Sequence, residues 1–217
     1  MKKPLFHLLI VLFAAAPLCA ADFTVTVTDA KGNPVENAVV ALKPETIPPL
    51  SAETAPAQII QKGKQFLPLV TVIQAGGKVE FPNQDSVQHH VYLFSKPKRF
   101  DIPLYKQSTP KPVVFETAGV VILSCNIHDW MKAYIFVAGT PYFAKSGLNG
   151  VARIVGLPSG KFQVEFWHPR LKKFLGNGLP QFVDIKDASN EVFSLSIELK
   201  KEIASERTTG AESGTYQ

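Results

Sequence analysis

The stretch VVILSCNIHDWMKAYIFV, residues 120–137, decides the fold that we expect. It holds two runs rich in β-branched and aromatic residues, 120–123 and 132–137, on either side of a loop from Cys125 to Met131. Short runs of this kind, bounded by polar and turn-forming residues, are typical of β-strands. The stretch therefore predicts two consecutive strands whose connecting loop carries a thiol, an imidazole and a thioether.

Similar runs recur along most of the chain, and no helical periodicity of useful length follows residue 21. The other expected strands cover residues 23–27, 35–42, 69–73, 78–81, 89–94, 113–115, 150–155, 162–167 and 192–199. The first two, joined by a turn at 29–34, predict an opening hairpin, whereas 95–112 predicts a long loop that serves either recognition or connection alone. Several short strands at this spacing predict an all-β sandwich or barrel.

The N-terminal segment has the order of a secretory signal peptide. Lys2 and Lys3 precede an apolar run at 5–13, and small residues follow up to Ala20 and Ala21. We therefore expect cleavage after Ala20 or Ala21 and a periplasmic mature protein. No apolar run reaches the roughly 18–20 residues of a spanning helix, so no membrane anchor is expected.

The composition excludes several classes of protein. The 217 residues are 46% hydrophobic and 19% charged, which is enough apolar material for one large or two small domains. Residues 1–21 contain two lysines and no acidic residue, so the mature chain would keep 21 basic against 18 acidic side chains. This excess is too small to indicate a nucleic-acid partner. Cys125 would be the only cysteine left, so it has no intramolecular disulfide partner.

The loop residues Cys125, His128 and Met131 follow one another at intervals of three. Thiolate, imidazole and thioether are the soft and borderline donors that copper prefers, and their softness favours copper over zinc. Electron-transfer copper sites combine two His, one Cys and a weak axial Met. The second imidazole must come from His89 or His90. Strand alternation puts His89 on the face of the apolar positions, which favours His89.

These motifs resemble a known family. Gly76-Gly-Lys-Val-Glu-Phe-Pro-Asn83 leads to His89-His90-Val91, and Cys125-x-x-His128-x-x-Met131 follows in the order typical of type 1 (blue) copper proteins, or cupredoxins. The resemblance covers residues 60–138, with an amicyanin-like gap between His128 and Met131. The chain is also similar to exported cupredoxin-domain proteins labelled as methylamine-utilisation proteins.

The resemblance implies one copper ion with His89, Cys125, His128 and Met131 as its ligands. The chain departs from the family at two positions. His90 stands where the family commonly has Asn, and Asp129 stands where amicyanin-like loops have Pro. Asp129 would either favour protonation of His128 on reduction or face solvent.

The two ends of the chain resemble a second family. Residues 23–42, with Asp29-x-x-Gly32-x-Pro34-Val35, and the later Leu157-Pro-Ser-Gly160 are similar to carboxypeptidase-regulatory-like domains, which have a carbohydrate-binding-like β-sandwich. We therefore expect a signal peptide at 1–21, a discontinuous sandwich formed by 22–44 and 140–200, a linker at 45–59, a cupredoxin domain at 60–139 and a disordered tail at 201–217. Otherwise, the flanking strands merely extend the cupredoxin sheets.

The expected fold is all-β, with a cupredoxin-like Greek-key sandwich inserted in, or extended by, a second small β-sandwich. The resemblance implies a monomeric periplasmic protein that is not an enzyme and carries single electrons between redox partner proteins. The alternatives are a periplasmic copper carrier or chaperone, an enzyme like a mononuclear copper oxidase, and a carbohydrate-binding-like module with a structural metal. Trp167 and Phe174 are the candidate sugar platforms, and His168, without a second donor cluster, is expected to be structural. Trp130 either packs or belongs to an apolar docking rim.

Overall fold

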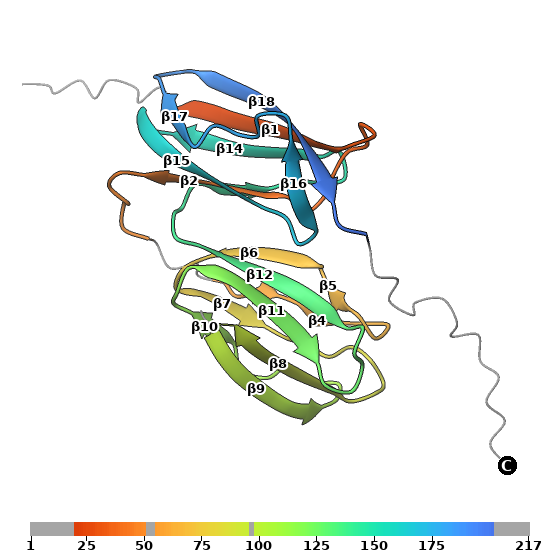
Figure 1. The fold of residues 1–217 in the computed structure, drawn as a ribbon. Coiled ribbons are helices and arrows are strands. Elements are labelled where there is room, and N and C mark those ends of the chain that lie inside the picture. The colour runs from red at the N-terminus through yellow and green to blue at the C-terminus, as the bar shows by residue number, and fades with distance from the viewer. Residues whose placement is uncertain (1–19, 51–54, 96–97, 202–217) are drawn as a thin grey trace, which may run out of the picture.

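Four layers of β-sheet stack on one another in the computed structural model, which describes residues 20–50, 55–95 and 98–201 (Figure 1). Those residues contain strands and no α-helix, so the expected all-β sandwich architecture is confirmed. Within the same ranges, no helix is long and apolar enough to cross a bilayer. The layers form two sandwiches, each with its own buried core.

The first sandwich combines strands from both ends of the chain. One sheet has the order β14-β1-β18-β16, formed by Val151–Leu157, Ala21–Asp29, Asn190–Leu199 and Leu171–Leu175. The facing sheet has the order β13-β2-β15-β17, formed by Phe143–Lys145, Val39–Pro44, Gly160–Trp167 and Phe182–Ile185. Apolar side chains at alternate positions of β1 point between the sheets and meet Leu42 and Phe162 from the facing sheet.

The second sandwich is built from the middle of the chain. Its larger sheet has the order β6-β12-β11-β8-β9, formed by Val70–Gln74, Lys132–Ala138, Gly119–Cys125, His89–Ser95 and Lys98–Tyr105. The opposite sheet has the order β10-β7-β3, formed by Val113–Phe115, Gly77–Glu80 and Ala57–Gln58, and a small pair joins β4 (Ile60–Gln61) to β5 (Phe66–Leu67). Phe81, Leu93, Phe115, Leu123 and Ile135 fill the core between them.

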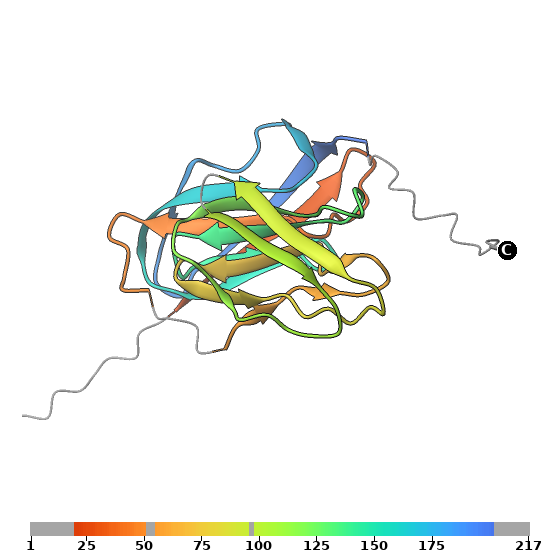
Figure 2. The same cartoon turned by 90° about the horizontal axis from the view of Figure 1, so that it is seen from below.

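The inner sheets of the two sandwiches pack against each other through a third buried cluster. Val39 of β2, Val70 of β6 and Phe136 of β12 belong to it. Trp167 of β15 places its ring centroid 6.0 Å from that of Phe136. In Figure 2, seen from below, the second sandwich lies in front of the first. Apolar side chains from both sandwiches are therefore buried together at this junction, between the two separate cores.

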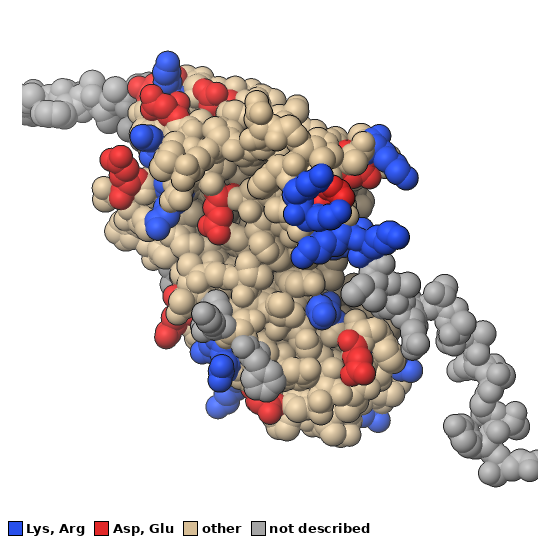
Figure 3. All heavy atoms as spheres, in the orientation of Figure 1, with Lys and Arg blue, Asp and Glu red and all other residues tan. Residues whose placement is uncertain are grey.

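Basic and acidic side chains are interspersed on the face shown in Figure 3. Its densest group of basic side chains lies near β16 and the end of β18, where Lys172 and Lys173 both pair with Glu198. These exposed ion pairs contribute little to stability because water screens them.

The opening hairpin expected from the sequence is wrong. The turn at 29–34 does form, because the Asp29 carboxylate accepts hydrogen bonds from the backbone of Lys31 and Asn33. Beyond a single bridge between Thr28 and Pro34, however, the strands separate into different sheets. β1 pairs instead with β14 and β18, and β2 pairs with β13 and β15.

The loop expected at 95–112 is also wrong, because much of it forms β9. This strand pairs with β8 at the edge of the larger sheet, and Phe100 and Ile102 pack against the core. Pro103 is tolerated because an edge strand has one side without ladder hydrogen bonds. Strands β16 and β17 were not expected from the sequence, nor was β3, which lies in the expected linker.

Several expected segments fall partly or wholly outside the described residues. These are the signal peptide, of which residues 1–19 are not described, and the tail from 202 to 217. Ala21, the last residue assigned to the signal peptide, opens β1 and is fully buried. Cleavage after Ala20 would keep this strand whole. The assignment of the two sandwiches to separate domains stays a prediction.

Candidate metal centre

Three donor side chains meet at one end of the second sandwich. His89 begins β8 and Cys125 ends the neighbouring β11, while His128 follows in the loop to β12. The Cys125 Sγ atom lies 3.8 Å from Nδ1 of His89 and 3.8 Å from Nδ1 of His128. One ligand atom from each of the three lies within 4.8 Å of the others. The antiparallel pairing of β8 with β11, in which Cys125 is opposite Val91, brings the first two donors together.

The donors are shielded from solvent to different degrees. His89 is 0% exposed and Cys125 is 2% exposed, whereas His128 is only half-buried. Burial, together with His89 and Lys64, lowers the pKa of His128. This favours the neutral imidazole, which is the form that binds a metal.

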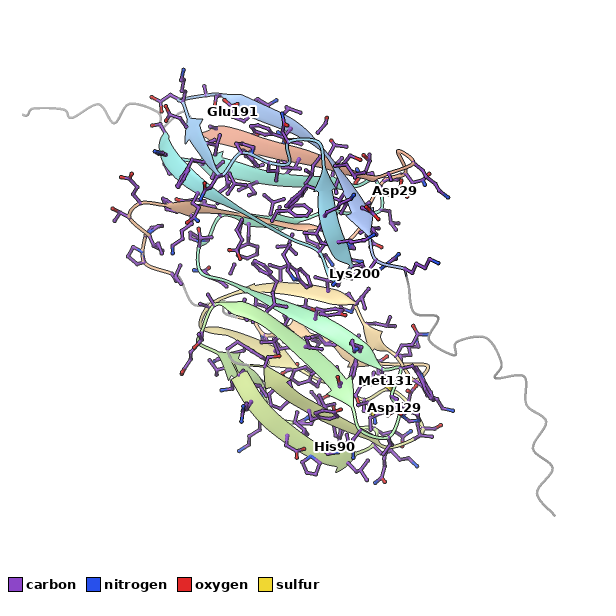
Figure 4. The ribbon with its side chains drawn as sticks, viewed as in Figure 1. Asp29, His90, Asp129, Met131, Glu191 and Lys200 are labelled. Atoms are coloured by element: carbon purple, nitrogen blue, oxygen red, sulfur yellow. The ribbon has the colours of Figure 1, made fainter. Side chains whose placement is uncertain are left out.

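Met131 is 1% exposed and belongs to the same core cluster as Cys125. Its backbone N–H donates to the His128 carbonyl at 2.9 Å, and its carbonyl accepts from the Cys125 N–H at 3.3 Å. These bonds close the loop into a compact turn. In Figure 4, Met131 and Asp129 lie in this loop between β11 and β12. Asp129 is exposed. The role of Met131 as a ligand stays a prediction.

His90 lies outside the cluster of donors. It is partly exposed, and its Nε2 atom contacts the carboxylate of Asp101 on β9. His89 therefore occupies the position beside Cys125, in agreement with the strand alternation that favoured it. Metal binding by His89 itself stays a prediction.

Asp85 was not recognised from the sequence. Its Oδ2 atom lies 2.8 Å from Nε2 of His89, on the side of the ring away from Cys125. The backbone N–H groups of Gly63 and Lys64 donate to the same carboxylate at 2.7 and 2.9 Å. Burial acts to raise the pKa of Asp85, but the hydrogen bonds from Lys64, His89 and Gly63 outweigh it and hold the pKa below its usual value. Only its spacing four residues before His89 could have signalled this contact.

Trp130 connects the loop to the rest of the site. Its Nε1–H donates to the Lys64 carbonyl at 3.1 Å, and its ring stands edge-on to His128 with centroids 5.2 Å apart. The side chain is 39% exposed, and that of nearby Ile127 is 48% exposed. Trp130 therefore packs against the site and also contributes exposed apolar surface around His128.

The other candidate residues lie away from this centre. His168 is buried, with Nε2 3.2 Å from the Glu36 carbonyl and Nδ1 accepting from the Arg170 N–H. Burial lowers its pKa to about 4, so it is a neutral structural residue at neutral pH. Trp167 lies in the junction between the sandwiches and is no exposed sugar platform. Phe174 is 41% exposed and packs edge-on against Phe166.

No family model and no curated protein sequence matches this chain. Among solved structures, it is similar to a copper-containing nitrite reductase from Thermus scotoductus, with 25% identity, 44% of this chain and 25% of that chain covered, and a TM-score of 0.37. It is also similar to a purple cupredoxin from Nitrosopumilus maritimus, at 27% identity. That match covers 38% of this chain and 99% of the cupredoxin, with a TM-score of 0.34. An amicyanin from Paracoccus versutus is 17% identical. That match covers 40% of this chain and 84% of the amicyanin, with a TM-score of 0.34. The chain thus spans about a quarter of the reductase.

Proposed function

We propose that this chain is a mononuclear type 1 copper protein that carries single electrons between partner proteins in the periplasm. One observation carries the proposal: two imidazoles and one thiol each place a ligand atom within 4.8 Å of the other two, at the end of an apolar core. Two imidazoles and a thiolate form a donor set that fits copper in both of its oxidation states.

Each proposed ligand has a distinct role. His89, Cys125 and His128 would hold the metal, and Met131 would supply a weak axial thioether. Bound there, copper would supply a one-electron couple. The chain's own contribution is to hold the donors in place and to keep water from the Cys125 sulfur, which is 2% exposed.

The partly exposed His128 offers the route to partner proteins. Of the three clustered donors, it alone is not fully buried. Trp130 and Ile127 beside it present apolar surface of the kind that short-lived protein contacts use. A partner docked here would reach the centre through the His128 ring.

The optical spectrum of the copper-loaded protein tests this function. Copper(II) should give an intense visible charge-transfer band from the Cys125 thiolate. Cys125→Ser should abolish the band while circular dichroism shows the β-sandwiches still folded, because their cores consist of apolar side chains from many strands. A colourless copper complex of the unaltered protein would contradict the type 1 assignment.

A copper carrier or chaperone would differ in exchange kinetics. A carrier must release its ion to a recipient, whereas an electron-transfer centre keeps its ion through many redox cycles. Rapid loss of copper to a competing chelator, without reversible one-electron voltammetry, would favour the carrier.

A further inference from the structure

Asp85 stands out among the acidic residues because its carboxylate faces a buried imidazole. Its side chain is 13% exposed and that of His89 is 0% exposed, with 2.8 Å between Oδ2 and Nε2. The contact lies on the opposite side of the ring from Cys125. Asp85 is therefore behind the proposed ligand and outside the donor set itself.

An ionised carboxylate can only accept a hydrogen bond, so His89 must carry a proton on Nε2. In the neutral ring this leaves the lone pair on Nδ1, which faces the Cys125 sulfur at 3.8 Å. The Asp85 contact thus selects the tautomer and the ring orientation that a metal between His89 and Cys125 requires.

Asp85 is itself held by two backbone N–H groups and one side-chain oxygen. Gly63 and Lys64 donate to its two oxygens, and its own N–H donates to the Asn83 side chain at 2.9 Å. The Lys64 carbonyl in turn accepts from Trp130 of the ligand loop. A continuous chain of hydrogen bonds therefore joins that loop to His89.

The next residue provides an internal comparison. His90 also contacts a carboxylate, that of Asp101, but it lies outside the donor cluster and the Asp101 side chain is 64% exposed. Two adjacent histidines thus have acidic partners, and only one of them faces Cys125.

We propose that Asp85 is a positioning residue that fixes His89 in its ligating tautomer. Through Lys64 and Trp130, it also holds His89 in place relative to the loop that carries Cys125 and His128. The metal-dependent part of this inference rests on the proposed function. A carboxylate behind a ligating imidazole also makes the ring a stronger electron donor. Asp85 therefore favours the oxidised ion over the reduced one.

The first test uses the metal-free protein. Ring ¹⁵N NMR, which distinguishes a protonated from an unprotonated ring nitrogen, should show His89 as a single tautomer with its proton on Nε2. Asp85→Ala should populate both tautomers. Asp85→Asn, whose amide oxygen still accepts a hydrogen bond, should restore part of the preference, and it carries the test if the alanine variant does not fold. Asp101→Asn should leave His89 unchanged.

The second test uses copper. Asp85→Ala should weaken Cu(II) binding by about ten- to a hundredfold in a chelator competition, the usual range for such supporting contacts. It should also raise the reduction potential. Asp101→Asn is the matched control, because it removes a carboxylate from the adjacent histidine without touching the chain of contacts to Cys125.

The outcomes separate this inference from the proposed function. An unchanged His89 tautomer in Asp85→Ala would overturn the positioning role, and so would an equal shift in potential in Asp101→Asn. If the tautomer changes as expected but the unaltered protein forms no coloured copper complex, the positioning role stands and the type 1 function fails.

Discussion

Two adjacent histidines on β8 have opposite surroundings because side chains alternate across a strand. His89 points into the core and reaches Cys125, whereas His90 points outward to Asp101. The same alternation buries Val91 and Leu93 on the side of His89. A shift of one residue in the register of β8 would exchange the two histidines, so the core that fixes this register also selects the donor.

Replacing each histidine tests this selection. His89→Gly should abolish the visible copper band, and added imidazole should restore it by filling the space that the ring vacates. His90→Gly should stay coloured because its ring lies outside the donor cluster. The measurement is the absorption spectrum of both copper-loaded variants. Loss of colour in His90→Gly alone would reverse the assignment.

Met131→Leu tests the expected axial thioether. The substitution nearly conserves volume in a site that is 1% exposed, so the fold should tolerate it. The colour should remain and the reduction potential should rise, because loss of a weak donor destabilises Cu(II) more than Cu(I). Protein-film voltammetry of both forms at one pH measures the shift. If the reduction potential of Met131→Leu equals that of the unaltered protein, Met131 is a core residue and not a ligand.

At the scale of the element, β9 shows how an edge strand is held. Phe100 packs between neighbouring aromatic rings, with centroids 5.4 Å from Phe81 and 6.2 Å from Phe115. A register irregularity lies between the pairs His89↔Tyr105 and Val91↔Ile102. Beyond it, Leu104 is 49% exposed while Tyr105 packs against the core. Burial at alternate positions therefore holds only one part of this strand.

Two substitutions on β9 should therefore lower the free energy of unfolding by different amounts. Phe100→Ala should lower the free energy of unfolding by about 2 kcal/mol, somewhat below the range for fully buried Phe because the ring is only partly buried. Leu104→Ala should change it by less than about 0.5 kcal/mol. Urea denaturation of the metal-free proteins measures both. Equal effects would mean that Phe100 does not anchor the strand.

At the scale of the whole molecule, the junction between the sandwiches resembles a core more than a loose contact. Phe136, from the sheet that carries Cys125, is 2% exposed although it faces away from its own sandwich. Lys145 of β13 also donates from Nζ to the Val70 carbonyl at 2.8 Å. Burial lowers the pKa of this lysine, as expected at a partly desolvated boundary.

Phe136→Ala should therefore destabilise both sandwiches together. The expected loss is about 3 kcal/mol or more, the usual cost of truncating a buried Phe. The chain's two tryptophans report separately, because Trp130 lies at the proposed metal centre and Trp167 lies at the junction. In single-tryptophan variants, the unfolding transitions reported by the fluorescence of Trp130 and of Trp167 should both shift to lower denaturant concentration. Val192→Ala, at a 62% exposed position, is the control and should shift neither. A shift confined to Trp167 would show that the sandwiches unfold independently.

The local pattern of the sequence was enough to predict most strands of the second sandwich. The expected strand at 113–115 agrees with β10, and those at 89–94 and 132–137 differ from β8 and β12 by one residue. The loop from Cys125 to Met131 and the spacing of its donors could also be predicted from the local sequence. These features depend on alternation and spacing between near neighbours in the chain, which a sequence displays directly.

Only the tertiary structure decided the remaining features. β1 takes its ladder partners, β14 and β18, from segments more than a hundred residues away, whereas β2 lies in the facing sheet and packs against the apolar face of β1. The Asp85 carboxylate that contacts His89 is held by the backbone of Gly63 and Lys64, more than twenty residues earlier, and no local pattern records those two contacts. Partners of this kind are selected by burial and hydrogen bonding between distant segments, so they are defined only once the sheets have packed.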